Sequence, residues 1–596
     1  MKKIFLLLSI LCTALTLSAK PIDEKQARDI ATNFFSQHMT RSAACNLKLE
    51  WAGSNIMGVS RAANTTDNPL LYIYNNESAN GFVIVSGDTN TDLVIAYSLN
   101  NNFDADNMSE AAQALLDAWC RQIEDARNSC KHISSESYQL TRANDELLYD
   151  TALWDQGEPY NREAPIIVDG ELSATGCAAT AMSIICYYHK WPNKGVGTTP
   201  AYTYVSDKDN KTYSVEANPL GRPYEYSKMK KSYNPSSKDY TEEQANAVAA
   251  LMKDMGTAIK MSYHPKGSGA IPQNVASAFC TYFSYSKGIQ LAYANDYSYE
   301  EWTALLRENL RNCGGPVFFS GLNYKGGGHA FVVDGYDANN RFHINYGWSG
   351  TDNGYYYLPA SEYYQGQNTI LNLKPDKDGT SVQQYYDHLS LMGEGRDEKA
   401  GKFTAGIFSD ALSYSPGSEF SCTIGYILND GVTTFNGYVA LALCDKNGNP
   451  KEVLSAAIIT LDPGYAWDWT DNCVMPETIK EGDRLRVFYI GEYSSDWQWA
   501  RKYKDEYTVD EVFVKAASPE DMAKDLWIKY EKDSHRFTFS NKQAMKVEVY
   551  YHDTNKKYGS VDLESFAKGY LDLTPGEAYR FEFSLGGEPY KIVIRP

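Results

Sequence analysis

The stretch Gly176-Cys177-Ala178-Ala179-Thr180-Ala181-Met182 decides the predicted fold. Apolar residues continue from it at helical spacing to Tyr188, and Trp191-Pro192 ends the pattern, which predicts a helix over residues 177–190. Cys177 would begin that helix, behind a glycine that leaves its sulfur uncovered. The unpaired N–H groups and the dipole at a helix N-terminus favour a thiolate, the nucleophilic form of cysteine. The sequence therefore predicts that Cys177 is a catalytic nucleophile.

A histidine and an asparagine follow Cys177 in the chain order of a thiol nucleophile, its base and the orienter of that base. His329 comes 152 residues after Cys177 (329 − 177) and begins a predicted strand over residues 329–336. Asn345 ends the next predicted strand, so both would lie on one β-hairpin, whose register the sequence leaves open. An asparagine beside the base can accept an imidazole N–H and fix its tautomer. Trp348 is expected to shield that hydrogen bond from water.

Two other histidines are less suited to act as the base. His343 would point into the strand that follows His329. His189 lies 12 residues from Cys177 on the same predicted helix, and at 1.5 Å per residue that places it roughly 18 Å from the thiol. His329 is therefore the predicted base.

Gln156, in the stretch 154–161, is the predicted donor to a tetrahedral oxyanion, together with the backbone N–H of Cys177. The alternative for a glutamine in a polar loop is a solvated side chain with no catalytic role. The predicted reaction is acyl transfer through a thioester.

Composition limits the classes of partner. The net charge of −19 (56 − 75) argues against nucleic acid and anionic membrane surfaces. The 11 cysteines are scattered without paired spacings and do not resemble a disulfide framework. Cys-x-x-Cys, His-Glu-x-x-His and Gly-x-Ser-x-Gly motifs do not occur in the sequence, so no metal site and no serine-hydrolase elbow is predicted.

At 596 residues the chain is too long for one core, and the pattern of predicted helices and strands changes along its length. Residues 1–19 read as an export signal, with an apolar stretch too short to span a membrane. The expected units after it are an α+β module (20–142), a module with all the candidate chemistry (143–375), and two β-sandwich-like modules (381–515 and 516–596). A polar linker is expected over residues 134–144, and a break between the last two modules near residues 516–520.

Periodicity predicts the individual elements. Helices are expected at residues 22–38, 109–127, 177–190, 241–256 and 299–311. Strands are expected at residues 70–74, 81–85, 93–97, 316–321, 329–336 and 341–346, and short strands separated by Asn/Gly/Asp turns follow residue 381.

Five separated motifs resemble, in order, the streptopain family of secreted bacterial cysteine peptidases, a branch of the papain-like superfamily. They lie at residues 81–88, 154–161, 176–192, 327–335 and 345–350, so the resemblance covers roughly residues 22–375. It implies an α+β fold in which a papain-like catalytic domain follows a small inhibitory propeptide and precedes the β-modules. Ala178 and Tyr346 stand where the family commonly has valine and tryptophan.

The resemblance also implies a function: a secreted, virulence-type thiol endopeptidase made as a zymogen, with no cofactor. Its partners would be protein or peptide substrates and its own propeptide as an intramolecular inhibitor. Ser268, Gly269, Ala270 and Gly328 are the residues expected to bind substrate. The expected location is extracellular or at the bacterial cell surface.

Two alternatives stay open at this point. A papain-like acyltransferase or amidase would use the same triad. A surface-binding protein with an inert peptidase domain would instead act through its β-modules, which are also candidates to hold a host protein or glycan; the final residues 590–596 faintly resemble an outer-membrane sorting tail.

Overall fold

The computed structural model describes most of the chain, with gaps. The described residues are 21–39, 46–54, 56, 68–129, 145–323, 327–361, 363–382, 386–391, 406–409, 414, 417–502, 511–514, 526–531, 536–541, 545–552, 554–563, 568–572, 578–585 and 588–594. The predicted export signal, the linker at 134–144 and the break at 516–520 lie outside them. No helix in the described part is long and apolar enough to cross a membrane.

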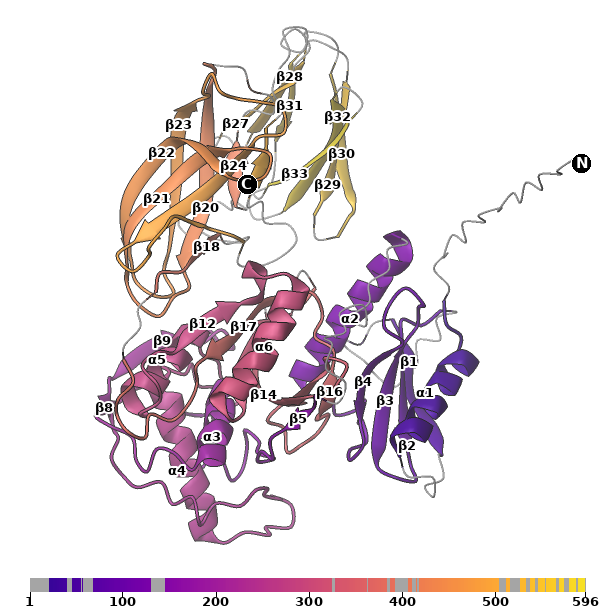
Figure 1. Cartoon of the computed structure of the whole chain (residues 1–596), viewed down its shortest axis with the longest axis vertical. Coiled ribbons are helices and arrows are strands. Elements are labelled where there is room, and N and C mark those ends of the chain that lie inside the picture. The colour runs from indigo at the N-terminus through magenta and orange to yellow at the C-terminus, as the bar shows by residue number, and fades with distance from the viewer. Residues whose placement is uncertain are drawn as a thin grey trace, which may run out of the picture.

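The N-terminal module (residues 21–129) is a small α+β unit, coloured indigo to purple in Figure 1. Its elements are α1 (Glu24–His38), β1 (Leu47–Gly53), β2 (Leu71–Asn76), β3 (Gly81–Ser86), β4 (Val94–Ser98) and α2 (Glu110–Ser129). Asp23 begins α1 with a capping box to Gln26, and the apolar face of that helix packs Phe34 and Phe35 onto the strands. The predicted helices and strands of this module are confirmed; β1 was not predicted.

The central module (residues 145–376) packs helices against an antiparallel sheet. Its helices are α3 (Cys177–His189), α4 (Glu242–Ala258), α5 (Pro272–Tyr282) and α6 (Tyr299–Cys313), with a short 3-10 helix η2 (Ala294–Asp296). Its main strands are β5 (Leu147–Leu148), β12 (Gln290–Tyr293), β13 (Val317–Leu322), β14 (Gly328–Tyr336), β15 (Phe342–Asn345), β16 (Gly354–Tyr356) and β17 (Gln365–Leu371). Short ribbons complete it: β6 (Ile167–Val168) with β7 (Glu171–Leu172), β8 (Thr198–Thr199) with β11 (Asn218–Pro219), and β9 (Tyr202–Val205) with β10 (Thr212–Val215).

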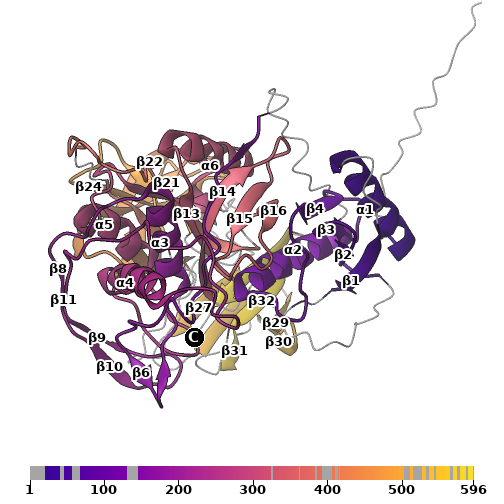
Figure 2. The same ribbon diagram turned by 90° about the horizontal axis from the view of Figure 1, so that it is seen from below.

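The N-terminal and central modules share one sheet and one core. The strand order is β1-β2-β3-β4-β16-β15-β14-β13-β17-β12, so the junction is the antiparallel pairing of β4 with β16. Figures 1 and 2 both show the N-terminal module continuing the sheet at β16. A single hydrophobic cluster runs from Ile84 and Trp119 on one side to Met182 and Phe331 on the other. The two modules are therefore packed as one body.

Two β-rich modules follow. The first has one sheet of β18 (Leu389–Leu391), β19 (Ile407–Ser409), β20 (Glu419–Asn429) and β23 (Ala466–Val474), and another of β21 (Phe435–Cys444), β22 (Pro450–Leu461), β24 (Arg484–Gly491), β25 (Gln498–Trp499) and β26 (Glu511–Phe513). Its core contains Leu391 and Ile424 from the first sheet with Leu441 and Val487 from the second, the arrangement of a β-sandwich. The second has sheets of β27 (Leu526–Glu531), β28 (Arg536–Asn541) and β31 (Lys568–Asp572), and of β29 (Met545–Tyr551), β30 (Lys557–Leu563), β32 (Tyr579–Leu585) and β33 (Glu588–Ile594).

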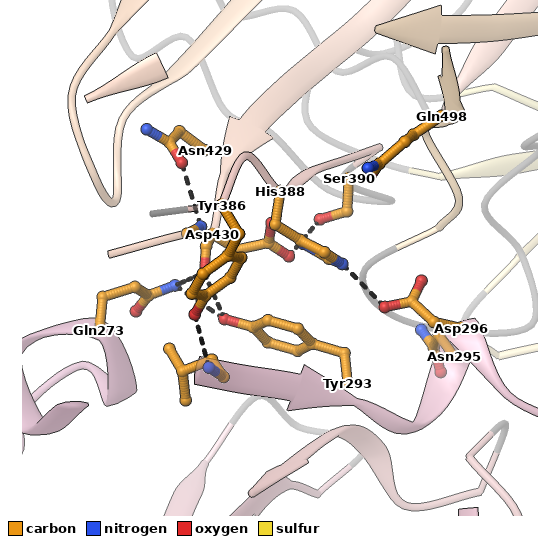
Figure 3. Close-up of polar contacts among 12 residues, drawn as sticks. Gln273, Tyr293, Asn295, Asp296, Tyr386, His388, Ser390, Asn429, Asp430 and Gln498 are labelled. Atoms are coloured by element: carbon orange, nitrogen blue, oxygen red, sulfur yellow. Dashed lines mark hydrogen bonds and ion pairs between the residues drawn. The ribbon is translucent and has the colours of Figure 1, made fainter. Parts of the chain in front are cut away.

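A buried histidine joins the first β-module to the central module (Figure 3). His388 Nδ1 lies 2.5 Å from Oδ1 of Asp430, in its own module, and Nε2 lies 2.7 Å from Oδ2 of Asp296, in the central module. Its ring stacks on Tyr293, whose hydroxyl donates to the Asp430 carbonyl at 2.7 Å. Burial alone would lower the pKa of His388, but the two carboxylates outweigh it and raise that pKa well above its usual value.

We expect His388→Ala to weaken the contact between these modules by about 3–5 kcal/mol, because it leaves the buried Asp430 carboxylate without its charged partner. Since the pKa of His388 is raised, its contribution is complete below its ordinary value of 6.5 and is lost as pH rises through the raised pKa. Thermal unfolding from pH 6 to pH 10 measures both effects. Asn295→Ala, which removes a neutral hydrogen bond to the Lys502 carbonyl across the same contact, is the matched control. Identical curves for His388→Ala and the unsubstituted chain would contradict this prediction.

Candidate active site

Cys177 is the first residue of α3, as predicted, and Gly176 makes that position accessible. Gly176 has φ of +86°, and a Cβ there would lie 2.6 Å from Met261 Cε and 3.1 Å from the Ser268 carbonyl oxygen. A larger residue would therefore be strained and would collide with the loop opposite. The glycine lets the helix start directly against the loop that was predicted to bind substrate.

The Cys177 thiol is half-buried, and its Sγ accepts a hydrogen bond from the Ala330 N–H at 3.4 Å. Burial raises the pKa of Cys177, and Glu110 of the N-terminal module adds to the rise. The N–H groups of Ala330, Ala178 and Cys177 itself lower that pKa, but by less. Burial therefore acts against the helix N-terminus at Cys177, and the thiolate expected from that helix position stays a prediction.

His329 is the second residue of β14, next to the Ala330 whose N–H contacts the thiol. Among the described contacts there is no hydrogen bond between the two side chains. The nearest charged group to His329 is Glu110 on α2, with 3.9 Å between Nε2 and Oε2. Burial lowers the pKa of His329, and Glu110 acts against that change. Because the Glu110 side chain is 71% exposed, this is a weak pair.

The sheet register explains why Asn345 does not meet His329 either. β14 and β15 form the predicted hairpin, and Asn345 lies opposite Val332. Residues two apart on a strand share a face, so Asn345 is in phase with Ala330 and out of phase with His329. The Asn345 amide instead donates to Thr151 Oγ1 at 3.0 Å and to the Ala152 carbonyl at 2.8 Å. The structure thus places base and orienter on adjacent strands but not in contact.

Gln156 and Trp348 lie in the loops beside the nucleophile. The Gln156 carbonyl accepts from the Thr175 N–H at 3.0 Å, which ties Gln156 to the loop that leads into Cys177. Trp348 is partly buried against the shared core, and the Trp154 carbonyl accepts from the next residue, Ser349. A backbone hydrogen bond therefore links Gln156 to the loop before Cys177, and another links the residue after Trp348 to Trp154.

The predicted substrate loop is built on its own hydrogen bonds. Ser268 Oγ donates to the Ala174 carbonyl at 2.8 Å and accepts from the His264 N–H at 2.9 Å. Gly269 exchanges two backbone hydrogen bonds with Ser262, and Ala270 packs partly against the core. Gly328 is exposed at the start of β14. The Ser268 hydroxyl is occupied by the protein, so this loop offers a substrate mainly its backbone.

The N-terminal module is held on the central module by polar contacts beyond the shared sheet. Trp119 Nε1 on α2 donates to the Tyr357 carbonyl at 2.9 Å, and the Ser109 N–H donates to Asp352 Oδ2 at 3.0 Å. Arg341 of the central module donates from two nitrogens to the Val94 carbonyl, at 3.1 and 2.9 Å. Burial at this contact raises the pKa of Asp352 to about 7.

Comparison with protein-family models gives two matches. The model described as the peptidase C10 family matches residues 154–356, and the model described as the Spi protease inhibitor matches residues 19–123. Streptopain from Streptococcus pyogenes is 30% identical over 356 residues, which are 57% of this chain and 85% of that protein. The chain belongs to the peptidase C10, or streptopain, family of cysteine endopeptidases. The resemblance noted in the sequence is thereby confirmed, as is the mixed α+β fold with an N-terminal propeptide region, a C10 peptidase domain and C-terminal β-rich sheets.

Other similar proteins add detail. The thiol protease/hemagglutinin PrtT of Porphyromonas gingivalis is 29% identical over 403 residues, and the match spans 63% of this chain but 44% of that protein. A fragment of prointerpain A from Prevotella intermedia, solved as an alanine mutant of a cysteine, is 25% identical with a TM-score of 0.46 and covers 56% of this chain and 99% of that chain. Active interpain A is 30% identical with a TM-score of 0.33 and covers 38% of this chain and 95% of that chain.

Sequence reasoning missed three polar residues linked to Asn345. Thr151 contacts it, and Asp334 and then His343 follow Thr151 in a chain of hydrogen bonds. Asp334 and His343 lie within the stretches that carry the predicted base and orienter, and that proximity was the available signal. His343 was considered only as a rival base. The described part of the chain contains no cluster of three or more metal-ligating side chains.

Proposed function

We propose that this chain is a secreted cysteine endopeptidase made as an inactive precursor, with residues 20–142 as its inhibitory propeptide. The observation that carries the proposal is the half-buried Cys177 thiol at the start of α3, packed against a core shared with an N-terminal module that places Glu110 beside His329. Membership of a cysteine endopeptidase family supports the reaction class. The apolar stretch after Met1 supports export.

Activation requires His329 to change its position. In the processed enzyme the start of β14 turns, so that the imidazole reaches Cys177 Sγ on one side and Asn345 Oδ1 on the other. Gly327 and Gly328 immediately precede His329, and glycines accept the backbone change at low cost. Loss of the N-terminal module removes Glu110, whose carboxylate adds to the raised pKa of Cys177. The thiolate–imidazolium pair can then form.

The proposed reaction has two steps. The Cys177 thiolate attacks the peptide carbonyl, and the Cys177 N–H with the Gln156 amide stabilises the oxyanion. The C–N bond breaks as His329 gives its proton to the leaving amine. In the second step His329 takes a proton from water, the hydroxide attacks the thioester, and the thiolate leaves with release of the acid. Asn345 orients His329, and Trp348 excludes water from that hydrogen bond. Ser268, Gly269, Ala270 and Gly328 line the peptide-binding side.

Incubating the purified full chain with and without reductant tests this function. With reductant we expect cleavage in the linker at residues 134–144, read by N-terminal sequencing, followed by internal cleavage of denatured casein. A parallel assay follows incorporation of a labelled amine into casein. Amine incorporation without peptide cleavage would favour an acyltransferase, and neither reaction would favour a binding protein with an inert peptidase domain. A peptide library digested by the processed enzyme then gives its subsite preference.

A further inference from the structure

A chain of polar side chains, linked by hydrogen bonds, ends at Asn345. It consists of Thr151 on the segment after β5, Asp334 on β14 and His343 on β15. Asn345, Asp334 and Thr151 are 0%, 1% and 6% exposed, respectively. Burying polar groups is costly unless each one is hydrogen-bonded. The pairing within this chain therefore restricts how each member can be oriented.

The Asn345 carboxamide has only one orientation that satisfies its neighbours. Its nitrogen has two hydrogens, and two acceptors lie in range: Thr151 Oγ1 at 3.0 Å and the Ala152 carbonyl at 2.8 Å. Its oxygen accepts from the Gly347 N–H at 3.1 Å. A carboxamide oxygen has two lone pairs, and among the described contacts the second one on Asn345 has no donor. Asn345 is thus presented as an acceptor, which is what the N–H of a histidine base requires.

Asp334 determines the direction of the Thr151 hydroxyl. A hydroxyl has one hydrogen, and Thr151 donates it to Asp334 Oδ2 at 2.5 Å. Because a carboxylate can only accept, the hydroxyl must donate to it and must accept from Asn345. If Thr151 donated to Asn345 instead, it would oppose the orientation that the Ala152 carbonyl and the Gly347 N–H favour, and the carboxamide would be held less firmly as an acceptor.

His343 and the backbone hold Asp334 in place. His343 Nδ1 lies 2.5 Å from the other carboxylate oxygen, Oδ1, and the Tyr149 N–H donates to the Asp334 carbonyl at 2.8 Å. The register of β14 shifts between Val333 and Gly335, so Asp334 lies at an irregularity of the strand. Such bulges re-aim a side chain, here toward both Thr151 and His343.

We propose that Asp334, acting with Thr151 and His343, is a positioning residue that fixes the Asn345 carboxamide as a hydrogen-bond acceptor for His329. The inference rests on the proposed function, since it concerns the orienter of the proposed base. None of the three residues contacts the reacting atoms. Their effect passes through Asn345 and therefore through the stability of the imidazolium.

Thr151→Val, which keeps the side-chain shape and removes the hydroxyl, is the main test variant in the full chain, assayed after processing and active-site titration. We expect kcat to fall about 10- to 100-fold, as for other supporting residues of active sites, with KM changed less than about twofold because substrate contacts are intact. The kcat of Asp334→Asn should fall likewise. The carboxylate has one oxygen facing Thr151 and another facing His343, whereas an amide has only one oxygen that can accept. Thr151→Ser retains the hydroxyl and should restore kcat to within about threefold of the unsubstituted enzyme.

The pH profile separates positioning from a general loss of structure. An acceptor at His329 favours imidazolium, so its loss should move the alkaline limb of kcat/KM to lower pH in Thr151→Val. Thr369→Val is the matched control: Thr369 is a buried threonine of the same sheet whose hydroxyl donates to the Phe318 carbonyl at 2.7 Å. It should leave both kcat and the pH profile unchanged.

A double-mutant cycle gives the decisive result. If Thr151 acts through Asn345, Thr151→Val combined with Asn345→Ala should be no slower than Asn345→Ala alone, which itself should retain measurable activity. Multiplicative losses, or equal effects of Thr151→Val and Thr369→Val, would overturn the positioning role. If Cys177→Ala or His329→Ala keeps its activity, the proposed function fails instead, so the two failures are distinguishable. If Thr151→Val does not fold, the kcat of Asp334→Asn is compared with that of Thr151→Ser to test the same point.

Discussion

Replacing Cys177 by alanine is expected to abolish hydrolysis of denatured casein and leave the fold intact. Cys177 is the first residue of α3, and its Sγ accepts from the N–H of Ala330, the residue that follows the proposed base His329. Its replacement removes the thiol that the proposed reaction requires. The variant cannot process itself and should accumulate at full length. Trace processed enzyme, later inactivated by alkylation, can remove its N-terminal module before the assay.

Cys186→Ala is the matched control for that experiment. Cys186 lies on the same helix but is fully buried, and burial raises its pKa to about 12, so it is a neutral thiol at pH 7. This control should process itself and cleave casein normally. Activity retained in Cys177→Ala and lost in Cys186→Ala would show that the nucleophile has been assigned to the wrong cysteine.

The second large effect concerns the N-terminal module. In the full chain burial raises the pKa of the Cys177 thiol above its ordinary value, so almost none of it is thiolate at pH 5, whereas a thiol paired with imidazolium is largely ionised. A thiolate of lower pKa is intrinsically less nucleophilic, which offsets part of that gain. We therefore expect alkylation of Cys177 by iodoacetamide at pH 5 to be about 100-fold faster after processing.

Casein hydrolysis should follow the same change. Processing is blocked by replacing Arg142, the basic residue of the polar linker at 134–144, together with its neighbours, and the unprocessed chain should then be inactive. Trp119→Ala in that blocked chain removes the hydrogen bond to the Tyr357 carbonyl and much of the shared apolar contact, so it should partly restore alkylation and activity. Leu148→Ala, at an exposed residue of β5, provides a control outside this contact. A blocked chain that cleaves casein as fast as the processed enzyme would refute the zymogen proposal.

Local patterns predicted the parts of the fold that local physics determines. Helix α3 was predictable because its period, its glycine start and its Trp-Pro end all lie within residues 176–192. Helix α5 was missed although Pro272 at its first position was a start signal, and β1 was missed because a short half-exposed strand carries a weak pattern. The pairing of β4 with β16 joins strands more than 250 residues apart, which no local pattern encodes.

The sequence allowed the residues of the candidate site to be predicted, but not how they are placed relative to one another. Motif order pointed to Cys177, His329 and Asn345, and the structure places them on α3, β14 and β15. Their separation depends on strand register, which is a tertiary property. Thr151 was overlooked because a threonine before the Trp154 motif has no signature of its own; its importance depends on Asp334, which lies 183 residues away.

Joining the two modules through a sheet has a consequence for the enzyme that remains. β16 is an interior strand while β4 pairs with it, and departure of the N-terminal module turns it into an edge with unpaired backbone groups. Long open edges invite pairing with other chains, but β16 comprises only Gly354–Tyr356, and a strand of that length offers few positions for a new ladder. A protease that sheds its own neighbour in this way exposes only a short template for aggregation at the moment it becomes active.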